Sequence, residues 1–158
     1  MRKLALLVVL LCATITHASE VIVGRVVKVS DGDTITVLTV EKQQVKVRLH
    51  GIDAPESKQA FGEKSRLALA ELVAGKDATV TVETKDRYGR VVGRVVVGKT
   101  DANLAQVAAG MAWWYRAYAK KDTALRDAES AAREARRGLW SDPNPVPPWD
   151  WRKQQKRR

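Results

Sequence analysis

VIVGRVVKVSDGDTITVLTVEKQQVKVRL, residues 21–49, contains three short runs rich in valine and other β-branched residues, which favour strands. Asp31-Gly32 separates the first two runs, and this dipeptide is typical of a tight hairpin turn. Over residues 45–49 apolar and polar side chains alternate, which indicates a strand with one buried face. We therefore predict three strands in sequence, over residues 21–29, 34–40 and 45–49.

The rest of the chain adds two strands and three helices. Valine-rich runs at 78–83 and 91–97 predict a second hairpin, joined around Tyr88-Gly89. Apolar residues at helical spacing, bounded by capping acids or terminal glycines, predict helices over residues 61–74, 102–109 and 124–137. Five short strands with helices between and after them favour an α+β arrangement, a small barrel that carries helices.

Length and charge limit the classes of protein that fit. A chain of 158 residues favours one domain with one core. It has 28 Lys and Arg against 18 Asp and Glu, a net charge of +10. This excess favours a polyanionic partner, but it does not choose among nucleic acid, anionic lipid and envelope polymers.

The first 18 residues have the pattern of a secretory signal. Arg2 and Lys3 precede an apolar run over residues 4–15, and Ala18 offers a small residue for cleavage. The alternatives are a membrane anchor, for which twelve apolar residues fall short of the roughly 20 required, and a lipid-modified Cys12. We therefore predict an exported protein, periplasmic or secreted, without a transmembrane anchor. Removal of Arg2 and Lys3 leaves 26 basic residues against 18 acidic ones, so +8.

The last residues differ in composition from the rest. Four prolines between residues 143 and 148 and a basic run over 152–158 predict a tail without regular structure, mobile in solution. We therefore place the folded domain at residues 19–141 and a Pro-rich basic tail at 142–158. Trp140 is expected to pack back on the last helix.

Three polar clusters have both a structural and a chemical interpretation. Asp31-Gly32-Asp33 is a hairpin turn, or it directs the Asp33 carboxylate at a metal ion. Residues 51–56, GIDAPE, form a capping box with Asp53 and Glu56, or they carry catalytic acids. Residues 86–90, DRYGR, are a hairpin with a charged exit, or they present an arginine to a substrate.

Together the clusters supply what hydrolysis of a phosphodiester requires. The attacked phosphate gains negative charge, so catalysis needs a hard cation, fixed guanidinium groups and a base for the attacking water. Carboxylate and carbonyl oxygens suit calcium or magnesium. No cluster of His and Cys exists to hold zinc, since His50 is the only histidine after residue 18.

The ordered motifs carry a family resemblance. Asp-Gly-Asp-Thr, then Arg-Leu-x-Gly-Ile-Asp-Ala-Pro-Glu, then Asp-x-Tyr-Gly-Arg resemble the staphylococcal nuclease (thermonuclease) family over residues 21–140. The resemblance implies a five-stranded oligonucleotide-binding (OB) barrel with three helices. It also implies an endonuclease that acts on DNA and RNA and leaves 3′-phosphate ends.

The resemblance assigns a metal site. Asp33 and Asp53 match the positions whose carboxylates bind one calcium ion, with other divalent cations as alternatives. Ala54, where many relatives have Thr, matches the residue that offers its backbone carbonyl. Asp31 matches an acid that contributes through the outer shell.

The resemblance also assigns catalytic and substrate-binding residues. Arg48 and Arg90 match two arginines that grip phosphate, and Glu56 matches the general base that activates the attacking water. Tyr88 matches a tyrosine that contacts phosphate, while Arg116 and Tyr118 stand at the positions of two base-stacking tyrosines. Trp113 and Trp114, just before them, either stack on bases or pack the domain.

The sequence therefore favours a calcium-dependent endonuclease, a monomer without a stable protein partner, whose substrates are DNA and RNA. Two alternatives remain: a non-catalytic OB-fold protein that binds nucleic acid, and an exported cationic protein that adheres to envelope polymers.

Overall fold

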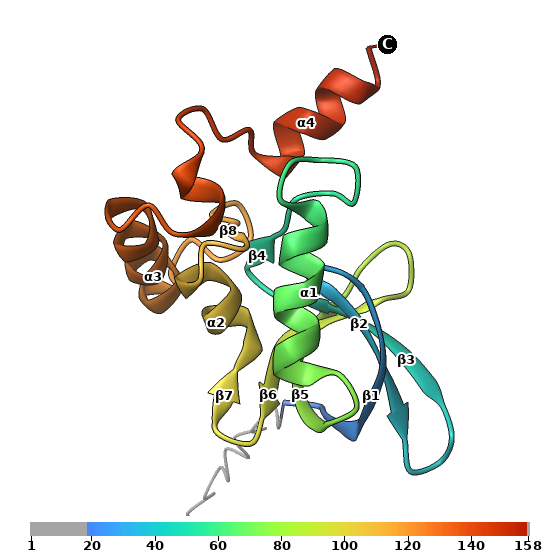
Figure 1. Ribbon diagram of the computed structural model, residues 1–158. Helices are drawn as coiled ribbons and strands as arrows, with labels where there is room; N and C mark the ends of the chain where they lie inside the picture. The colour runs from blue at the N-terminus through green and yellow to red at the C-terminus, as the bar shows by residue number, and fades with distance from the viewer. Residues whose placement is uncertain (1–18, 158) are drawn as a thin grey trace, which may run out of the picture.

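The computed structural model describes residues 19–157, so the predicted signal over residues 1–18 lies outside the described residues (Figure 1). The elements are β1 (Val21–Asp31), β2 (Thr34–Thr39), β3 (Gln44–Leu49), β4 (Ile52–Asp53), α1 (Gly62–Val73), β5 (Asp77–Lys85), β6 (Val91–Val97), β7 (Thr100–Asp101), α2 (Ala102–Ala108), β8 (Trp113–Trp114), α3 (Thr123–Glu134), the 3₁₀ turn η1 (Gly138–Ser141) and α4 (Pro148–Gln155).

The five long strands form a closed barrel. They lie in the order β3-β2-β1-β5-β6, and the two ends of this sheet join because β3 pairs with β6 in parallel, with Val47 beside Val91 and Leu49 beside Gly93. β1 is long enough to pair with β5 through its first half and with β2 through its second half. Two register shifts in the β1–β2 pairing bend the strand, as bulges do in small barrels. The predicted five-stranded α+β barrel is confirmed.

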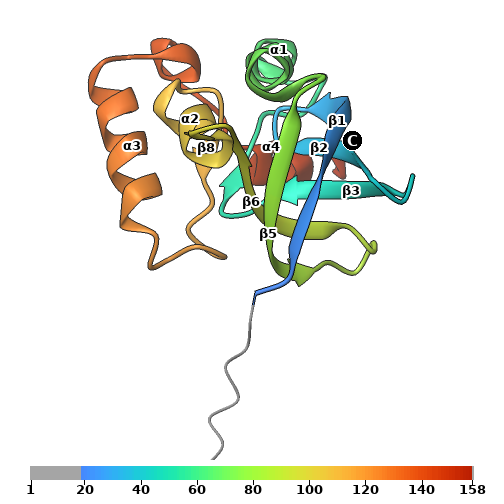
Figure 2. The same ribbon diagram turned by 90° about the horizontal axis from the view of Figure 1, so that it is seen from below.

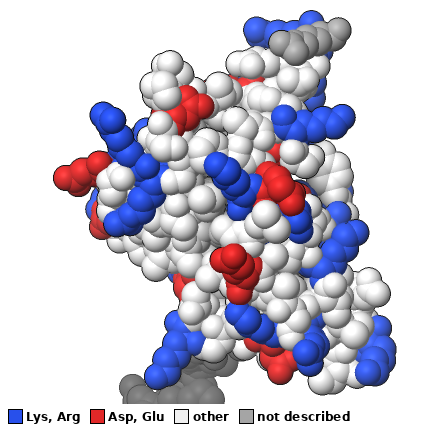
Figure 3. Space-filling view, viewed as in Figure 1, with Lys and Arg blue, Asp and Glu red and all other residues white. Residues whose placement is uncertain are grey.

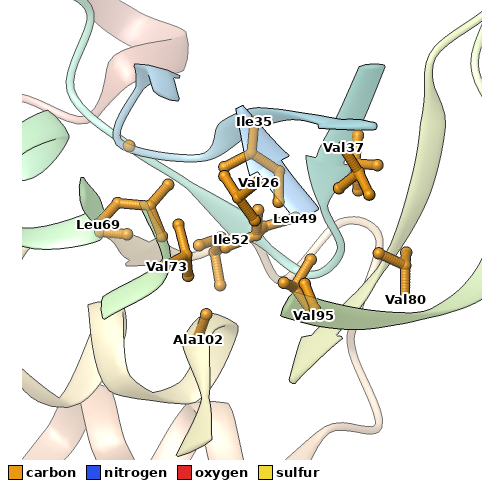
Figure 4. Packing of buried hydrophobic residues seen from close by; sticks show 14 of the residues in the cluster. Val26, Ile35, Val37, Leu49, Ile52, Leu69, Val73, Val80, Val95 and Ala102 are labelled. Atoms are coloured by element: carbon orange, nitrogen blue, oxygen red, sulfur yellow. The ribbon is translucent and has the colours of Figure 1, made fainter. Parts of the chain in front are cut away.

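The barrel interior is filled by the alternating apolar residues of its strands. Ile35, Val37, Val47, Val80 and Val95 are fully buried. Leu69 and Val73 of α1 pack against the same cluster (Figure 4). Burial of this apolar surface is the main source of stability for the domain.

The helices lie outside the barrel. α1 crosses it, and α2 and α3 lie together on one side (Figures 1 and 2). The Asp101 and Asp122 side chains accept hydrogen bonds from Leu104 N and Leu125 N, both at 3.0 Å, so the predicted caps of α2 and α3 are present. None of the helices over residues 19–157 is long and apolar enough to span a membrane.

The capping-box interpretation of Asp53 and Glu56 is wrong. α1 begins at Gly62, after Phe61 at φ 65°, and no side chain caps it. Asp53 lies in β4, and Glu56 lies in the loop between β4 and α1. Their carboxylates are therefore available for interactions outside the helix.

The prediction that the tail lacks regular structure is also wrong. α4 begins at Pro148, where the missing amide hydrogen costs nothing because the first helical amides have no partner within the helix. Trp149 of α4 stacks on Tyr115, with ring centroids 5.3 Å apart and planes 8° apart. Trp140 packs as expected, with the Arg133 guanidinium of α3 at 3.8 Å from its ring centroid.

The hairpin turn between β1 and β2 fits closely against α1. A Cβ atom on Gly32 would lie 1.8 Å from Ser65 Oγ and 2.8 Å from the Ala54 Cβ. Gln106 of α2 is buried beside them and donates to Gly32 O at 2.7 Å and to Ser65 O at 3.0 Å. Gly32 is therefore required by this close approach.

We expect Gly32→Ala to lower the free energy of unfolding by about 1–3 kcal/mol, because the added methyl group must displace α1 or Ala54. Urea denaturation followed by circular dichroism measures this change. Gln43→Ala, at an exposed position in the β2–β3 hairpin, is the control and should change stability by less than about 0.5 kcal/mol. Equal stability of the two variants would contradict the close fit.

Candidate active site

Arg48 of β3 joins the two acids that the sequence assigns to a metal. Its Nη1 donates to Asp33 Oδ1 at 2.7 Å, and its Nη2 donates to Asp53 Oδ1 at 2.8 Å. Asp33 comes from the β1–β2 turn and Asp53 from β4, so one guanidinium connects three elements. Burial disfavours the charged form of Arg48, but Asp33 and Asp53 outweigh it and raise the pKa of the guanidinium.

Asp33 is buried, and both of its carboxylate oxygens accept hydrogen bonds. Oδ1 accepts from Thr34 Oγ1 at 2.9 Å in addition to Arg48, and Oδ2 accepts from Ala54 N at 2.8 Å. Burial raises the pKa of Asp33, and the Asp31 charge adds to this effect, while Arg48 opposes it. Asp31 Oδ1 accepts from Asp33 N at 3.2 Å and so fixes the turn. The turn that the sequence offers as one interpretation is present, and the Asp33 carboxylate points away from it toward Arg48 and Ala54 N.

Glu56 reaches the same region from the loop after β4. This loop is anchored on one side because β4 pairs with β8, with Asp53 opposite Trp113. On the other side it lies against the start of α1, where a Cβ atom on Gly62 would be 2.0 Å from Glu56 O. The Glu56 side chain is 38% exposed, whereas that of Asp53 is 1% exposed. Glu56 is therefore the solvent-facing acid of the cluster.

The oxygens around Asp53 fit a hard cation. The Asp33 and Asp53 carboxylates both accept hydrogen bonds from the Arg48 guanidinium. Ala54 is buried, and its carbonyl accepts no hydrogen bond from the described residues. A buried carbonyl without a donor suits a cation or an ordered water. Within residues 19–157 no three acidic, His or Cys side chains group closely enough to hold an ion alone. A cation held here would therefore need water or substrate oxygens to complete its coordination.

Arg90 lies on the neighbouring strand and makes no hydrogen bond to this cluster. β3 and β6 are parallel, with Arg48 beside Val92, so Arg90 enters β6 at the same edge of the barrel. Asp86 Oδ2 accepts from Arg90 Nε at 2.7 Å, and Asp86 Oδ1 accepts from Arg90 N and Tyr88 N. Burial favours a higher pKa for Asp86, but these hydrogen bonds outweigh burial and lower the pKa. The terminal nitrogens of Arg90 have no hydrogen bond to the described residues.

The predicted substrate-binding residues Tyr88, Arg116 and Tyr118, here called the rim residues, are all exposed. Tyr88 is exposed in the β5–β6 hairpin, and Arg116 and Tyr118 are exposed after β8. Because β8 pairs with β4, the segment that carries Arg116 and Tyr118 starts next to Asp53. The Tyr118 ring is supported by Tyr115, with centroids 4.9 Å apart.

Trp113 and Trp114 have packing roles. Trp113 is buried edge-on against Trp140, with centroids 4.3 Å apart, and Trp114 Nε1 donates to Ala119 O at 2.9 Å. Glu129 and Arg133 form an i,i+4 ion pair at 3.3 Å, and Glu129 also accepts from Trp114 N. Of the two open interpretations of these tryptophans, the structure favours packing.

Arg152 of α4 is the site residue that sequence reasoning missed. Its Nη2 donates to Asp53 Oδ2 at 2.7 Å, and its Nη1 donates to Glu56 Oε1 at 2.7 Å. Two signals could have pointed to an ordered segment here. Pro148 is suited to the first turn of a helix, and Trp149 and Trp151 are residues that disordered tails lack.

Comparisons with known proteins agree with this geometry. Residues 46–142 match the family described as "Staphylococcal nuclease homologue". The chain is 44% identical over 157 residues to an "Uncharacterized endonuclease" of Haemophilus influenzae, covering 98% of this chain and 88% of that protein. It is 47% identical over 143 residues to a "Micrococcal nuclease" of Shigella flexneri, covering 84% and 82%. Together with the closed barrel, these matches establish that the chain belongs to the staphylococcal nuclease family.

Proposed function

We propose that the protein is a calcium-dependent endonuclease that hydrolyses phosphodiester bonds of DNA and RNA and leaves 3′-phosphate ends. The observation that carries the proposal is the convergence of Asp33, Asp53 and Arg48, joined by hydrogen bonds of 2.7–2.8 Å, with Glu56 three residues beyond Asp53. The names of the relatives, endonuclease and micrococcal nuclease, support the same class of enzyme.

Asp33, Asp53 and the Ala54 carbonyl would hold the cation. Asp31 would contribute without touching the cation directly. A calcium ion bound there supplies positive charge to the phosphate oxygens. The buried carboxylates of Asp33 and Asp53 are acceptor-only groups when ionised, and hard cations prefer such oxygens. Asp31 holds the turn that presents Asp33, since it accepts from the Asp33 amide.

Glu56 would accept the proton of the attacking water, because it is the acid of the cluster that solvent reaches. Arg48 and Arg90 would bind the phosphate. Both have their position fixed by carboxylates, and a planar guanidinium can contact two phosphate oxygens at once. Arg90 has its terminal nitrogens free to do so, which suits the partner of the leaving oxygen.

Nucleic acid would be held by charge and by the rim residues Tyr88, Arg116 and Tyr118. Figure 3 shows Lys and Arg side chains spread over the face that is seen in Figure 1. Contacts to the backbone carry no base code, so the proposal includes both DNA and RNA. We further propose that the protein acts as a monomer after export, in the periplasm or outside the cell, since residues 1–18 have a signal pattern.

One assay separates this function from its alternatives. The chain from Ser19 to Arg158 is incubated with DNA and calcium, with and without a chelator, and the products are run on a gel. Cleavage that the chelator abolishes supports the enzyme. DNA that is retarded but uncut supports a non-catalytic binding protein, and unaltered DNA supports an adhesive role for the basic surface.

Glu56→Gln keeps the size of the side chain and removes its basicity. We expect kcat to fall by about 10²–10⁴-fold, which is the usual contribution of a positioned base. Glu63→Gln is the matched control, because Glu63 is an exposed acid of α1 that pairs with Arg66. Activity of Glu56→Gln equal to that of the control, with unchanged thermal stability, would remove Glu56 from the mechanism.

Calcium binding should depend on substrate, because the chain supplies only a few ligands. We expect weak binding to the free protein and at least tenfold tighter binding with a nucleotide inhibitor, whose phosphate oxygens complete the coordination. Isothermal titration calorimetry measures both constants. Calcium affinity that is the same with and without the nucleotide would show that phosphate takes no part in the metal site.

A further inference from the structure

The C-terminal arm, residues 142–157, reaches into the candidate active site. It leaves the barrel after η1, and α4 projects beyond the loop that carries Glu56 (Figure 1). Arg152 is the arm residue that contacts the acids of the site. Its two terminal nitrogens contact both oxygens of Asp53, at 3.3 and 2.7 Å, and Glu56 Oε1 at 2.7 Å.

The charge balance of the site depends on this residue. The carboxylates of Asp33, Asp53 and Glu56 face the guanidinium groups of Arg48 and Arg152. If Arg152 leaves, three acids face one guanidinium, and Asp53 loses the partner on Oδ2. A divalent cation would restore the balance. A cation on the same carboxylate while Arg152 is in place would instead stand beside a positive group that repels it.

The arm is attached in a way that allows it to leave. None of its residues belongs to the barrel core; Trp149 packs against the smaller cluster around Trp113 and Trp140 and stacks on Tyr115, and Pro148 is buried. Gln59 Nε2 donates to Val146 O at 2.6 Å. Between the arm and the Glu56 loop lies a hollow of about 210 Å³, lined by Pro55, Phe61, Asn144 and Trp151 among others. Close packing, which would fix the arm, is absent along this side.

We propose that Arg152 occupies the cation position of the free protein, and that the arm must release Asp53 and Glu56 before a divalent cation binds there. The inference rests on the proposed function, because it concerns the same site. The arm would then keep the enzyme inactive at low cation concentration. Release also removes the Arg152 hydrogen bond from Glu56 Oε1 and so makes that oxygen available to water.

The consequence for affinity follows from a two-state equilibrium. A cation that binds only the released state has its apparent affinity reduced by the fraction of molecules in that state. Removing the Arg152 guanidinium should therefore strengthen calcium binding. Removing a positive charge elsewhere on α4 should leave calcium binding unchanged, because that charge does not occupy the cation position.

The test compares calcium binding by three proteins that start at Ser19. They are the unmodified chain, Arg152→Gln and Lys153→Gln, titrated by calorimetry without nucleic acid. Lys153 is the matched control, since it is exposed on the same helix and pairs only with Asp150, at 3.0 Å. We expect Arg152→Gln to bind calcium about tenfold more tightly than the unmodified chain, and Lys153→Gln to bind within twofold of it.

A second readout follows the arm itself. Hydrogen exchange of the α4 amides, residues 148–155, should become faster in the unmodified chain when calcium is added, because the helix loses its contacts with Asp53 and Glu56. Equal calcium affinity of all three proteins, or α4 amides that stay protected with calcium bound, would overturn this inference and leave the proposed function intact. Failure of all three to bind calcium, with or without nucleotide, would overturn both.

Discussion

The Arg48 guanidinium holds together the carboxylates on which the site depends. Asp33 and Asp53 are both buried, and two such charges placed side by side repel each other and lose the hydration that stabilises them in water. Arg48 donates to both, and its positive charge opposes this repulsion. Because Asp33, Arg48 and Asp53 come from different elements, the same interaction fixes the β1–β2 turn, β3 and β4 relative to one another. Removing one partner of such a buried group typically costs 3–5 kcal/mol.

The barrel brings these elements to one edge. Closure by the β3–β6 pairing places Arg48 and the entry of Arg90 on adjacent parallel strands, and the β4–β8 pairing fixes the Asp53 strand against the aromatic segment. Close contacts then set the details. Gly32 lies against Ser65 with Gln106 bonded to both residues, and Gly62 lies against the Glu56 backbone. Small residues at these two points let the acids approach one another, which larger side chains would prevent.

Much of this could be predicted from the sequence, because the relevant patterns are local. β-branched alternation predicted the five long strands, and the ordered motifs included the three side chains, Asp33, Arg48 and Asp53, that the structure joins by hydrogen bonds. Three features were not predicted. The side chain of Gln106 acts through contacts between residues distant in sequence, and the capping-box pattern at Asp53 and Glu56 matched a helix start that lies further along, at Gly62. The arm was misjudged because its prolines outweighed the helix start at Pro148 and the packing of Trp149.

The claim that one cation and one phosphate meet between Asp33, Asp53 and Arg48 is tested most directly by crystallography. Crystals grown with calcium and a nucleotide would be measured for the anomalous signal of the metal. The account predicts a single peak in contact with the Asp33 and Asp53 carboxylates and the Ala54 carbonyl, with a phosphate oxygen as a further ligand and Arg48 beside that phosphate. A peak elsewhere, or a nucleotide bound without a metal between these acids, would contradict it.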